Sequence, residues 1–479
     1  MKATTLLAGV VAAACAAHAE IRDITVHHGG HPVFPGRPDL PAGTITLRSG
    51  EASASAEIAL PFKGDPSRLK TVKLGGRGAR PSFGDGKIVF RAPTVEGACS
   101  YTLYLEPEKG TPLSETFEIG GAVFRTGALV TAPGMEIEGT GRRSRNFRIP
   151  GVAETRSGAL VAVFDIRYNN AGDLPEDIDV GVSVSRDGGA TWSPVRVAIP
   201  WRGTPGGKGV GDPAILYDAA NSRLWIAALR APECGHPIFS SRKGTCSPAG
   251  CGQLLLSYSD DEGGTWSAPV NVTGAVKRPG DADTAEWGCL FQGPGAGIAM
   301  RDGTLVFPAQ VWGDRGRAPH HGVLVWSKDG GRTWHSSKAM PFGGSESTVA
   351  ETAPGELLLN TREGTRGRRT SAVTRDLGET WEKIQCDIPQ PVSCCQGAAL
   401  AADGTLYFSN PASAGRRDNM TLRKSEDGGR TWSAGEVYDA RPCAGYSSLC
   451  TVGKDRIGVL YEGDSDWTYF ISVPRGEVK

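Results

Sequence analysis

The 479-residue sequence has no excess of charge of either sign and little apolar sequence of the kind that spans a bilayer. Lysine and arginine total 52, as do aspartate and glutamate, so no broad basic surface is expected to attract nucleic acid or an anionic membrane. A positively charged site would have to be built locally. The strongly apolar stretch TTLLAGVVAAACAA, near the N-terminus, is too short for a transmembrane helix.

Aromatic residues are also scarce, at 7%, whereas glycine (66) and proline (32) are plentiful. This mixture favours many short strands joined by turns over long helices. A chain of this length is expected to form two domains, or one large repeat architecture with an appendage.

The first residues have the pattern of a secretory signal peptide. Lys2 precedes the apolar stretch, and Ala17-His18-Ala19 follows it as a small-x-small exit. We therefore assign residues 1–19 to a signal peptide and expect a secreted, periplasmic or cell-surface protein.

Cysteine usage is consistent with export. Ten cysteines remain after Cys15 is removed with the leader, and in an exported protein the default interpretation is disulfides. Cys234, His236, Cys246 and Cys251 are close enough in sequence to suggest zinc, but their spacing matches no strong zinc pattern. Disulfides or free thiols are favoured over a metal.

A repeated turn motif, S-x-D-x-G-x-T-W, sets the architecture. Its five copies begin about 50 to 75 residues apart, the length of a four-stranded blade with insertions. They are SRDGGATW from Ser185, SDDEGGTW from Ser259, SKDGGRTW from Ser327, TRDLGETW from Thr374 and SEDGGRTW from Ser425.

The chemistry of each copy is that of a hairpin turn. In the first, Asp187 can accept hydrogen bonds from its own backbone, Gly189 permits φ > 0, and Trp192 supplies an apolar anchor. Alternating apolar strands precede the turns, so the pattern predicts a β-propeller, with every repeat aspartate structural rather than catalytic. Residues 20–135 lack the motif and show short alternating runs, which predict a separate small β-sandwich.

One stretch concentrates the polar residues that could carry chemistry. Phe147-Arg148-Ile149-Pro150 places an arginine at the start of a strand, and Arg167 and then Asp173 follow in a polar loop. Loops at the ends of blade strands are where propeller sites gather. Taken singly, Arg148 could pair with a carboxylate, and Asp173 could cap a turn.

Together with the five repeats, which are Asp boxes, these residues resemble the sialidase family, whose propellers have six blades. The resemblance implies an all-β chain with a six-bladed β-propeller over residues 136–479. It implies that Arg148 is the first of three arginines that bind the substrate carboxylate. Asp173 would be the general acid/base, and Arg167 would line the pocket near O4 of the sugar.

The resemblance continues along the chain. Asp212, in GDP, looks like a second pocket aspartate near O4. Glu346, in GSEST, looks like the glutamate that partners the nucleophile, and Glu351 is its rival. Tyr446, in GYSSLC, stands where the family has its tyrosine nucleophile.

Three further positions complete the match. Arg362, in LLLNTREG, looks like the second carboxylate-binding arginine. The third is Arg417 by its context, with Arg416 as the alternative. Glu462, in LYEG, matches the glutamate that holds the first arginine.

The chemistry of these residues agrees with the resemblance. Sialic acid carries a carboxylate, which arginines bind bidentately and which would repel a carboxylate nucleophile. A neutral tyrosine avoids that repulsion, and sialidases use one. The expected function is an exo-α-sialidase that acts with retention on sialylated glycoproteins, gangliosides or oligosaccharides. We expect a monomer, and the chemistry implies no metal or organic cofactor.

Two alternatives remain. A trans-sialidase or intramolecular trans-sialidase would use the same residues and differ in what reaches the covalent intermediate first. A non-catalytic Asp-box propeller that binds glycans would be expected to lack one or more of the three arginines, Asp173 or Tyr446, and all of these residues are present.

Overall fold

The structure is a computed structural model of the whole chain. It describes the backbone of seven strands between Thr46 and Ile119, and residues 128–478 except 205, 319, 363–368, 392–393, 440–442 and 464–466. The chain divides into two compact units, the larger of which begins at Gly127. The assigned signal peptide lies outside the described residues.

The described part of the N-terminal unit is entirely β. One antiparallel sheet has the order β1-β2-β5-β4 and a second has the order β3-β6-β7. The strands are β1 (Thr46–Ser49), β2 (Ser55–Pro61), β3 (Leu69–Gly75), β4 (Ser82–Gly84), β5 (Lys87–Pro93), β6 (Cys99–Pro107) and β7 (Leu113–Ile119). The predicted β character is present, and the predicted sandwich packing stays a prediction.

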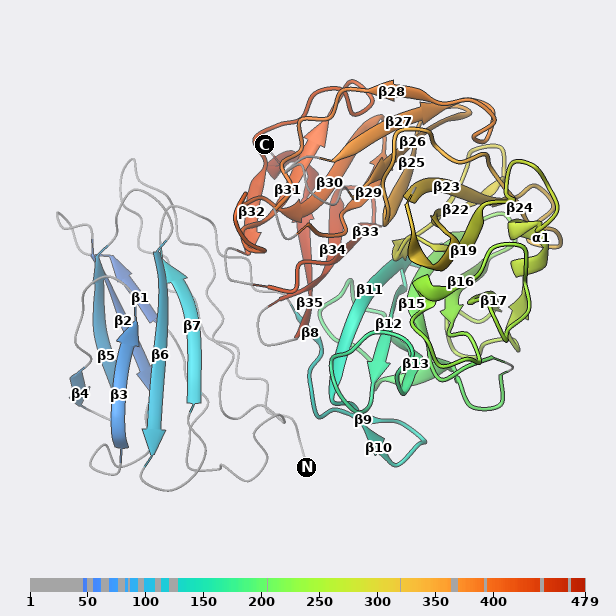
Figure 1. Cartoon of the computed structure of the whole chain (residues 1–479). Coiled ribbons are helices and arrows are strands. Elements are labelled where there is room, and N and C mark those ends of the chain that lie inside the picture. Colours follow the sequence, from blue (N-terminus) through green and yellow to red (C-terminus); the bar gives the residue numbers. More distant parts are fainter. Residues whose placement is uncertain are drawn as a thin grey trace. The chain divides into compact units, whose positions relative to one another are not determined.

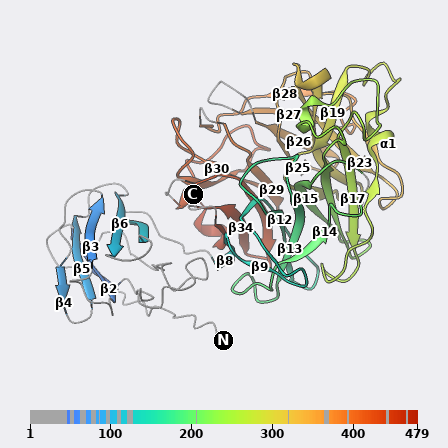
Figure 2. The same cartoon turned by 60° about the horizontal axis from the view of Figure 1, so that its bottom comes forward.

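The larger unit is a six-bladed β-propeller (Figures 1 and 2). The first three blades are β11 (Asn146–Glu154), β12 (Leu160–Arg167), β13 (Ile178–Ser185) and β14 (Arg196–Ile199); β15 (Val210–Asp218), β16 (Arg223–Arg230), β17 (Gln253–Ser259) and β18 (Val270–Asn271); and β19 (Trp287–Gln292), β22 (Leu305–Gly313), β23 (His320–Ser327) and β24 (His335–Ser336).

The remaining three blades follow the same order of pairing. They are β25 (Ser347–Ala353), β26 (Glu356–Thr361), β27 (Thr370–Thr374) and β28 (Glu382–Ile384); β29 (Ala398–Ala402), β30 (Thr405–Pro411), β31 (Met420–Ser425) and β32 (Glu436–Asp439); and β33 (Ser447–Val452), β34 (Arg456–Glu462), β35 (Thr468–Pro474) and β8 (Ala128–Thr131).

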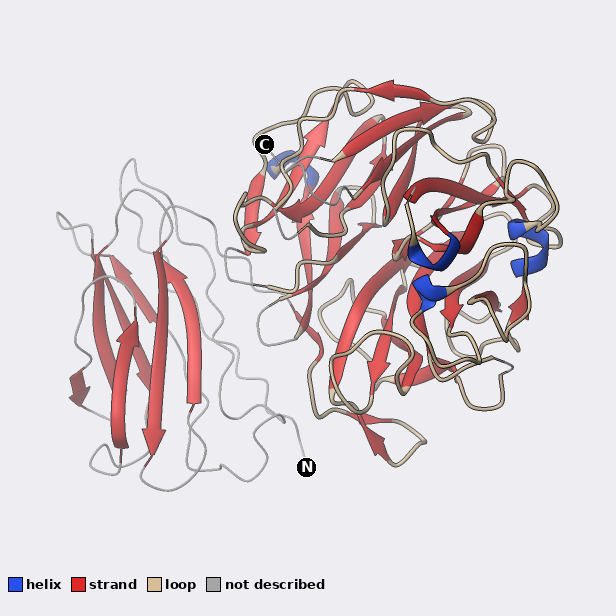
Figure 3. Ribbon diagram, in the orientation of Figure 1, coloured by secondary structure: helices blue, strands red, loops and turns tan. Residues whose placement is uncertain are grey.

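Short elements decorate this ring, and helix in the described part of the chain is confined to them (Figure 3). β20 (Gly295–Ala296) adds to the second sheet and β21 (Ile298–Ala299) to the third. The others are the hairpin β9 (Glu136–Ile137) with β10 (Arg142–Arg143), the helix α1 (Thr273–Lys277), and 3-10 turns at Ile238–Ser240, Asp314–Gly316 and Arg475–Glu477. Among the described residues, no helix is long and apolar enough to cross a membrane.

The Asp boxes form the turns between the third and fourth strands of five blades. In the first box, Asp187 Oδ1 accepts hydrogen bonds from the Thr191 N–H at 2.9 Å and the Ser185 hydroxyl at 2.8 Å. The corresponding aspartates of the other four boxes make the same bonds. The predicted structural role of these aspartates is confirmed.

The glycine of each box allows its turn to approach a neighbouring blade. Gly189 has φ +93°, and a Cβ there would lie 2.1 Å from Cε1 of Phe470 on β35 of the sixth blade. Gly331 likewise has φ +83°, and a Cβ would lie 2.2 Å from Trp225 on the second blade. Glycine is therefore required both by the backbone conformation and by blade-to-blade contact.

The sixth blade explains why six blades carry five boxes. Its fourth strand is β8, which pairs with β35 through Thr131↔Thr468 and Leu129↔Tyr469. Because this strand comes from the other end of the propeller sequence, no hairpin joins it to β35. The blade sheet thus includes residues that precede the expected start of the propeller at residue 136.

The hydrophobic core lies mainly between neighbouring blades. Val163 and Val182 of the first blade pack in one cluster with Ile215 and Ile226 of the second. Phe164 of the first blade shares a cluster with Leu460 and Phe470 of the sixth, and this closes the ring. Stability therefore depends on each sheet having a neighbour on both sides.

The expected disulfides do not form among the residues that the structure describes. The described cysteines are spread over several blades, as with Cys289 on β19 and Cys450 on β33, and spacing in the sequence does not reveal this separation. Near the cysteines whose spacing suggested zinc, Lys277 Nζ donates to Cys251 Sγ at 3.2 Å. No group of three or more metal-binding side chains occurs within the described ranges.

The contact between Gly189 and Phe470 predicts a large effect of Gly189→Ala on stability. Gly158→Ala is the matched control, because Gly158 has φ +85° and an added Cβ would have nothing within 4 Å. The control should lose about 1 kcal/mol from backbone strain, and Gly189→Ala about 2 to 4 kcal/mol because of the added overlap. Urea unfolding measures both, and equal losses would contradict blade-to-blade packing at this turn.

Candidate active site

The residues predicted from the sequence gather at one end of the propeller, where the innermost strands begin and the second strands end. The antiparallel order places the Asp-box turns at the opposite end. The residues are Arg148 on β11, Arg167 at the end of β12, Asp173 in the following loop, Asp212 on β15, Glu346 before β25, Arg362 after β26, Arg417 before β31, Tyr446 before β33 and Glu462 at the end of β34.

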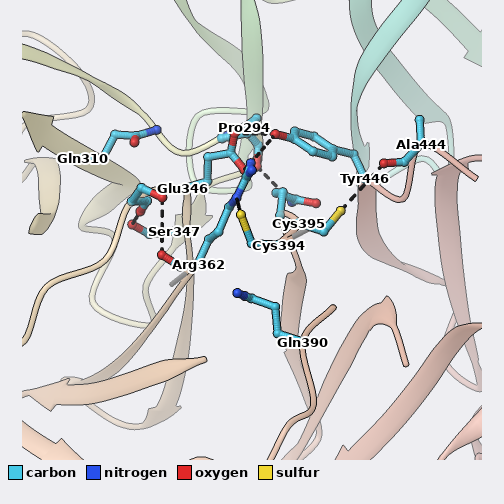
Figure 4. Close-up of polar contacts among 12 residues, drawn as sticks. Pro294, Gln310, Glu346, Ser347, Arg362, Gln390, Cys394, Cys395, Ala444 and Tyr446 are labelled. Carbon is cyan, nitrogen blue, oxygen red and sulfur yellow. Dashed lines mark hydrogen bonds and ion pairs between the residues drawn. The ribbon is translucent and has the colours of Figure 1, made fainter. Parts of the chain in front are cut away.

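Within this group, Tyr446 lies beside Glu346 and Arg362 (Figure 4). Its hydroxyl donates a hydrogen bond to Glu346 Oε1 and accepts one from Arg362 Nη1 at 2.9 Å. The same Arg362 nitrogen lies 2.6 Å from Glu346 Oε2. Burial and the neighbouring Glu346 carboxylate raise the pKa of Tyr446 well above its usual value, although Arg362 and Arg148 oppose this. The resting tyrosine is therefore a neutral phenol whose proton points at a carboxylate.

Arg148 is fixed by Glu462 from the neighbouring blade. Its Nε and Nη2 donate to the two Glu462 oxygens at 2.8 and 3.1 Å. Glu462 also accepts the backbone N–H groups of Ile149 at 2.8 Å and Tyr446 at 3.2 Å. Burial alone would raise the pKa of Glu462, but the Arg148 charge and these hydrogen bonds hold it below the usual value. Glu462 thereby links the first arginine to Tyr446.

The geometry brings Arg417, rather than Arg416, to Tyr446. The Arg417 guanidinium carbon lies 5.9 Å from the centre of the Tyr446 ring, and that of Arg148 lies 5.0 Å from it. Arg417 donates to the carbonyl oxygens of Ala444 and Cys394. The Arg416 side chain is 76% exposed and pairs with the buried Asp418.

Glu346 and its sequence rival Glu351 have different surroundings. Glu346 contacts Tyr446 and Arg362, as described above. Glu351 accepts the backbone N–H groups of Arg301 at 2.9 Å and Gly355 at 3.0 Å, so it stabilises a turn at the far end of β25. Glu346 is the glutamate that the fold brings to the site.

A second group of charges lies on the first two blades. The Asp173 side chain is 78% exposed, and its Oδ1 pairs with Arg167 Nη1 at 2.9 Å. Arg167 is buried and pairs on its other side with Asp165 at 2.9 Å. Burial raises the pKa of Asp165 to about 6. Burial, reinforced by Asp165, also raises the pKa of Asp212 well above its usual value.

A cavity of about 610 Å³ opens beside Glu346 and Arg362. Its other walls include Gln310, Trp312, His320 and Cys394, of which Gln310, His320 and Cys394 were not predicted from the sequence. Trp312 and His320 stack with their ring centres 3.9 Å apart, and Arg362 Nε donates to Cys394 Sγ at 3.1 Å. Gln310, Trp312 and His320 come from the paired strands β22 and β23 of the third blade, whereas Cys394 lies between the fourth and fifth blades, so the sequence carries no single motif for this wall.

This arrangement can bind a carboxylate and perform nucleophilic chemistry. Three guanidinium groups surround Tyr446, and one of them is already paired with the glutamate that accepts the tyrosine hydrogen bond. Arginine charge is permanent and suits bidentate recognition of a planar anion. The exposed Asp173 can serve as an acid or base at the margin of the same group.

Comparison with known proteins identifies a matching family model and several similar sialidases. The family model described as "BNR repeat-like domain" matches residues 158–459. A sialidase of Bacteroides fragilis is 40% identical over 339 residues, which are 67% of this chain and 60% of that protein. A sialidase of Micromonospora viridifaciens is 30% identical over 334 residues, 66% of this chain and 50% of that protein. The chain thus spans between half and three-fifths of the length of these relatives.

A solved structure supports the same relationship. The Hadza microbial sialidase Hz136 superposes with a TM-score of 0.67 at 28% sequence identity, covering 92% of this chain and 99% of that chain. The similarity includes the six-bladed propeller described above.

The largely buried Arg148–Glu462 pair should contribute more to the stability of the fold than an exposed ion pair does. The same Glu→Gln change made in each kind of pair tests this. Glu462→Gln should cost about 3 kcal/mol, because it leaves a largely buried guanidinium without its counter-charge. Glu136→Gln removes a pair to Arg143 in which both side chains are 64% exposed, and should cost less than about 0.5 kcal/mol. Urea unfolding near pH 7 measures both variants.

The difference in unfolding free energy between the parent and Glu462→Gln should depend on pH. The folded pKa of Glu462 is depressed, so its stabilisation is present above the unfolded glutamate pKa of about 4.3 and is lost as the pH falls through the folded value. The gap between the parent and Glu462→Gln should therefore narrow below about pH 4. A gap that is independent of pH would contradict the ion pair as its cause.

Proposed function

The chain belongs to the BNR-repeat sialidase family, and we propose that it is an exo-α-sialidase that hydrolyses terminal α-ketosidically linked sialic acids. The observation that carries the proposal is the convergence of three arginines and one glutamate on Tyr446. The proposed substrates are sialylated glycoproteins, gangliosides and oligosaccharides. Their common feature is a carboxylate on the anomeric carbon, next to the bond that is cleaved.

Arg148, Arg362 and Arg417 would bind the substrate carboxylate. Each lies close to Tyr446, through a bond to its hydroxyl or within 6 Å of its ring. A carboxylate held between them would place the adjacent anomeric carbon beside the tyrosine oxygen. The fixed positive charge offsets the desolvation of the substrate anion and orients it for attack.

In the first half-reaction, Tyr446 would act as the nucleophile. Glu346 takes the phenolic proton while the tyrosine oxygen forms a bond to the anomeric carbon. The bond between that carbon and the glycosidic oxygen breaks, and Asp173 protonates the departing oxygen. The product is a covalent tyrosyl-enzyme intermediate, and the shortened glycan leaves as a neutral alcohol.

In the second half-reaction, water would reverse these roles. Asp173 accepts a proton as the water oxygen attacks the anomeric carbon, and the bond to Tyr446 breaks. The tyrosine oxygen recovers its proton from Glu346. Two successive displacements at one carbon give net retention, so sialic acid is released first as its α-anomer.

Location is part of the proposal. The leader assigned to residues 1–19 favours export to the periplasm, the cell surface or the medium, where sialylated glycans would be encountered.

Arg167 and Asp212 would contribute to the pocket wall near O4 of the sugar.

Tyr446→Phe tests the nucleophile. This change removes the attacking oxygen together with its hydrogen bonds to Glu346 and Arg362, so release of 4-methylumbelliferone from its α-sialoside should fall at least about 1,000-fold. Tyr258→Phe is the control, because Tyr258 lies on β17 and stacks with Arg223 away from the site. No release by the folded parent would refute the proposed activity, and undiminished release by Tyr446→Phe would refute the assignment of the nucleophile.

A further inference from the structure

Two carboxylates occupy related places in neighbouring blades. Glu462 lies at the end of the second strand of the sixth blade and accepts the N–H of Ile149, a residue with φ 63° on the first strand of the next blade. Asp165 lies near the end of the second strand of the first blade. It accepts the N–H of Asp212, at 2.8 Å, and Asp212 has φ 52° on the first strand of the following blade.

The two carboxylates also bind an arginine each. Glu462 pairs with Arg148, whereas Asp165 Oδ2 accepts bonds from Arg167 Nε at 3.1 Å and Nη2 at 2.9 Å. In both places a β-bulge interrupts the first strand, between Arg148 and Gly151 and between Gly211 and Ala214. Bulges of this kind re-aim side chains toward a site.

The surroundings of Asp165 are built for this contact. Its side chain and that of Arg167 are each 1% exposed. A Cβ on Gly211 would lie 2.8 Å from Asp165 Oδ1, so glycine is what allows the backbone before Asp212 to approach the carboxylate. A buried ion pair with both partners satisfied holds one geometry, and removing one partner leaves the other charge unpaired.

From Arg167 the contacts continue to the loop that carries Asp173. Arg167 Nη1 donates to the Ala171 carbonyl at 2.6 Å and pairs with Asp173 Oδ1 at 2.9 Å. Asp165 therefore orients the Arg167 guanidinium on one edge, and that guanidinium holds the exposed Asp173 on the other. The same Asp165 carboxylate fixes the backbone of Asp212.

We propose that Asp165 is a positioning residue for the reaction, which holds the general acid Asp173 through Arg167 and fixes the backbone of Asp212. The inference rests on the proposed function. Asp165 touches no substrate in this scheme. Its loss should displace the acid and leave the nucleophile Tyr446 and the carboxylate-binding arginines in place.

This role has a kinetic signature that general structural damage lacks. An aryl leaving group departs as a stable phenolate and needs little protonation, whereas the sugar alcohol leaving from sialyllactose needs a proton from the acid. A misplaced Asp173 should therefore impair cleavage of α2,3-sialyllactose more than cleavage of 4-methylumbelliferyl α-sialoside. A partly unfolded enzyme would lose both activities in the same proportion.

The experiment measures kcat/KM on both substrates for the parent, Asp165→Asn and Asp173→Asn. We expect Asp165→Asn to lose about tenfold more on sialyllactose than on the aryl substrate, in the same direction as Asp173→Asn. Asp218→Asn is the matched control, because Asp218 is 2% exposed and caps a turn at the far end of β15. It should leave the ratio of the two activities unchanged.

A second variant covers the case in which Asp165→Asn does not fold. Gly211→Ala adds a methyl group against Asp165 and should shift the ratio in the same direction without altering a charge. If the variant that folds loses both activities equally, or loses neither, the positioning role is wrong and the proposed function stands. If the folded parent cleaves neither substrate, the proposed function itself fails.

Discussion

The convergence of positive charge on one buried phenol is the constraint on which the site depends. Three guanidinium groups repel one another, so each must be held by a partner that leaves a face open for ligand. Glu462 holds Arg148, Glu346 binds Arg362, and the carbonyl oxygens of Ala444 and Cys394 bind the third, Arg417. In the proposed reaction the substrate carboxylate supplies a further negative charge to these three arginines.

The propeller meets this constraint through its topology. Each innermost strand begins at the same end of the ring, so residues far apart in sequence reach the centre from different blades. Tyr446 and Glu346 are 100 residues apart yet share a hydrogen bond. The ring must be closed for this geometry to persist, and closure depends on β8 joining β35 and on close contacts such as that between Gly189 and Phe470.

Local sequence patterns are enough to predict the Asp-box turns and, from their repetition, a propeller. The Asp boxes specify their own turns through bonds between residues four apart, as with Asp187 and Thr191, so the motif alone identifies them. Pairing over long distances has no such local signal, and this is why the sequence predicts a propeller that begins after the strand Ala128–Thr131. In the sequence, Asp165 is simply one polar residue of a buried strand. The proposed role of Asp165 depends on its ion pair with Arg167 and on its hydrogen bond to the backbone of the next blade, which only the structure shows.

In the proposed reaction Tyr446 forms a covalent bond to the substrate, and trapping that bond is the decisive measurement. A 2,3-difluorinated sialic acid loses fluoride from C2 readily, while its second fluorine slows the hydrolysis of the intermediate. Peptide mass spectrometry after incubation should show one sialosyl adduct on Tyr446, with none in Tyr446→Phe. An adduct on another residue, or an inverted first product with no adduct, would contradict Tyr446 as the nucleophile.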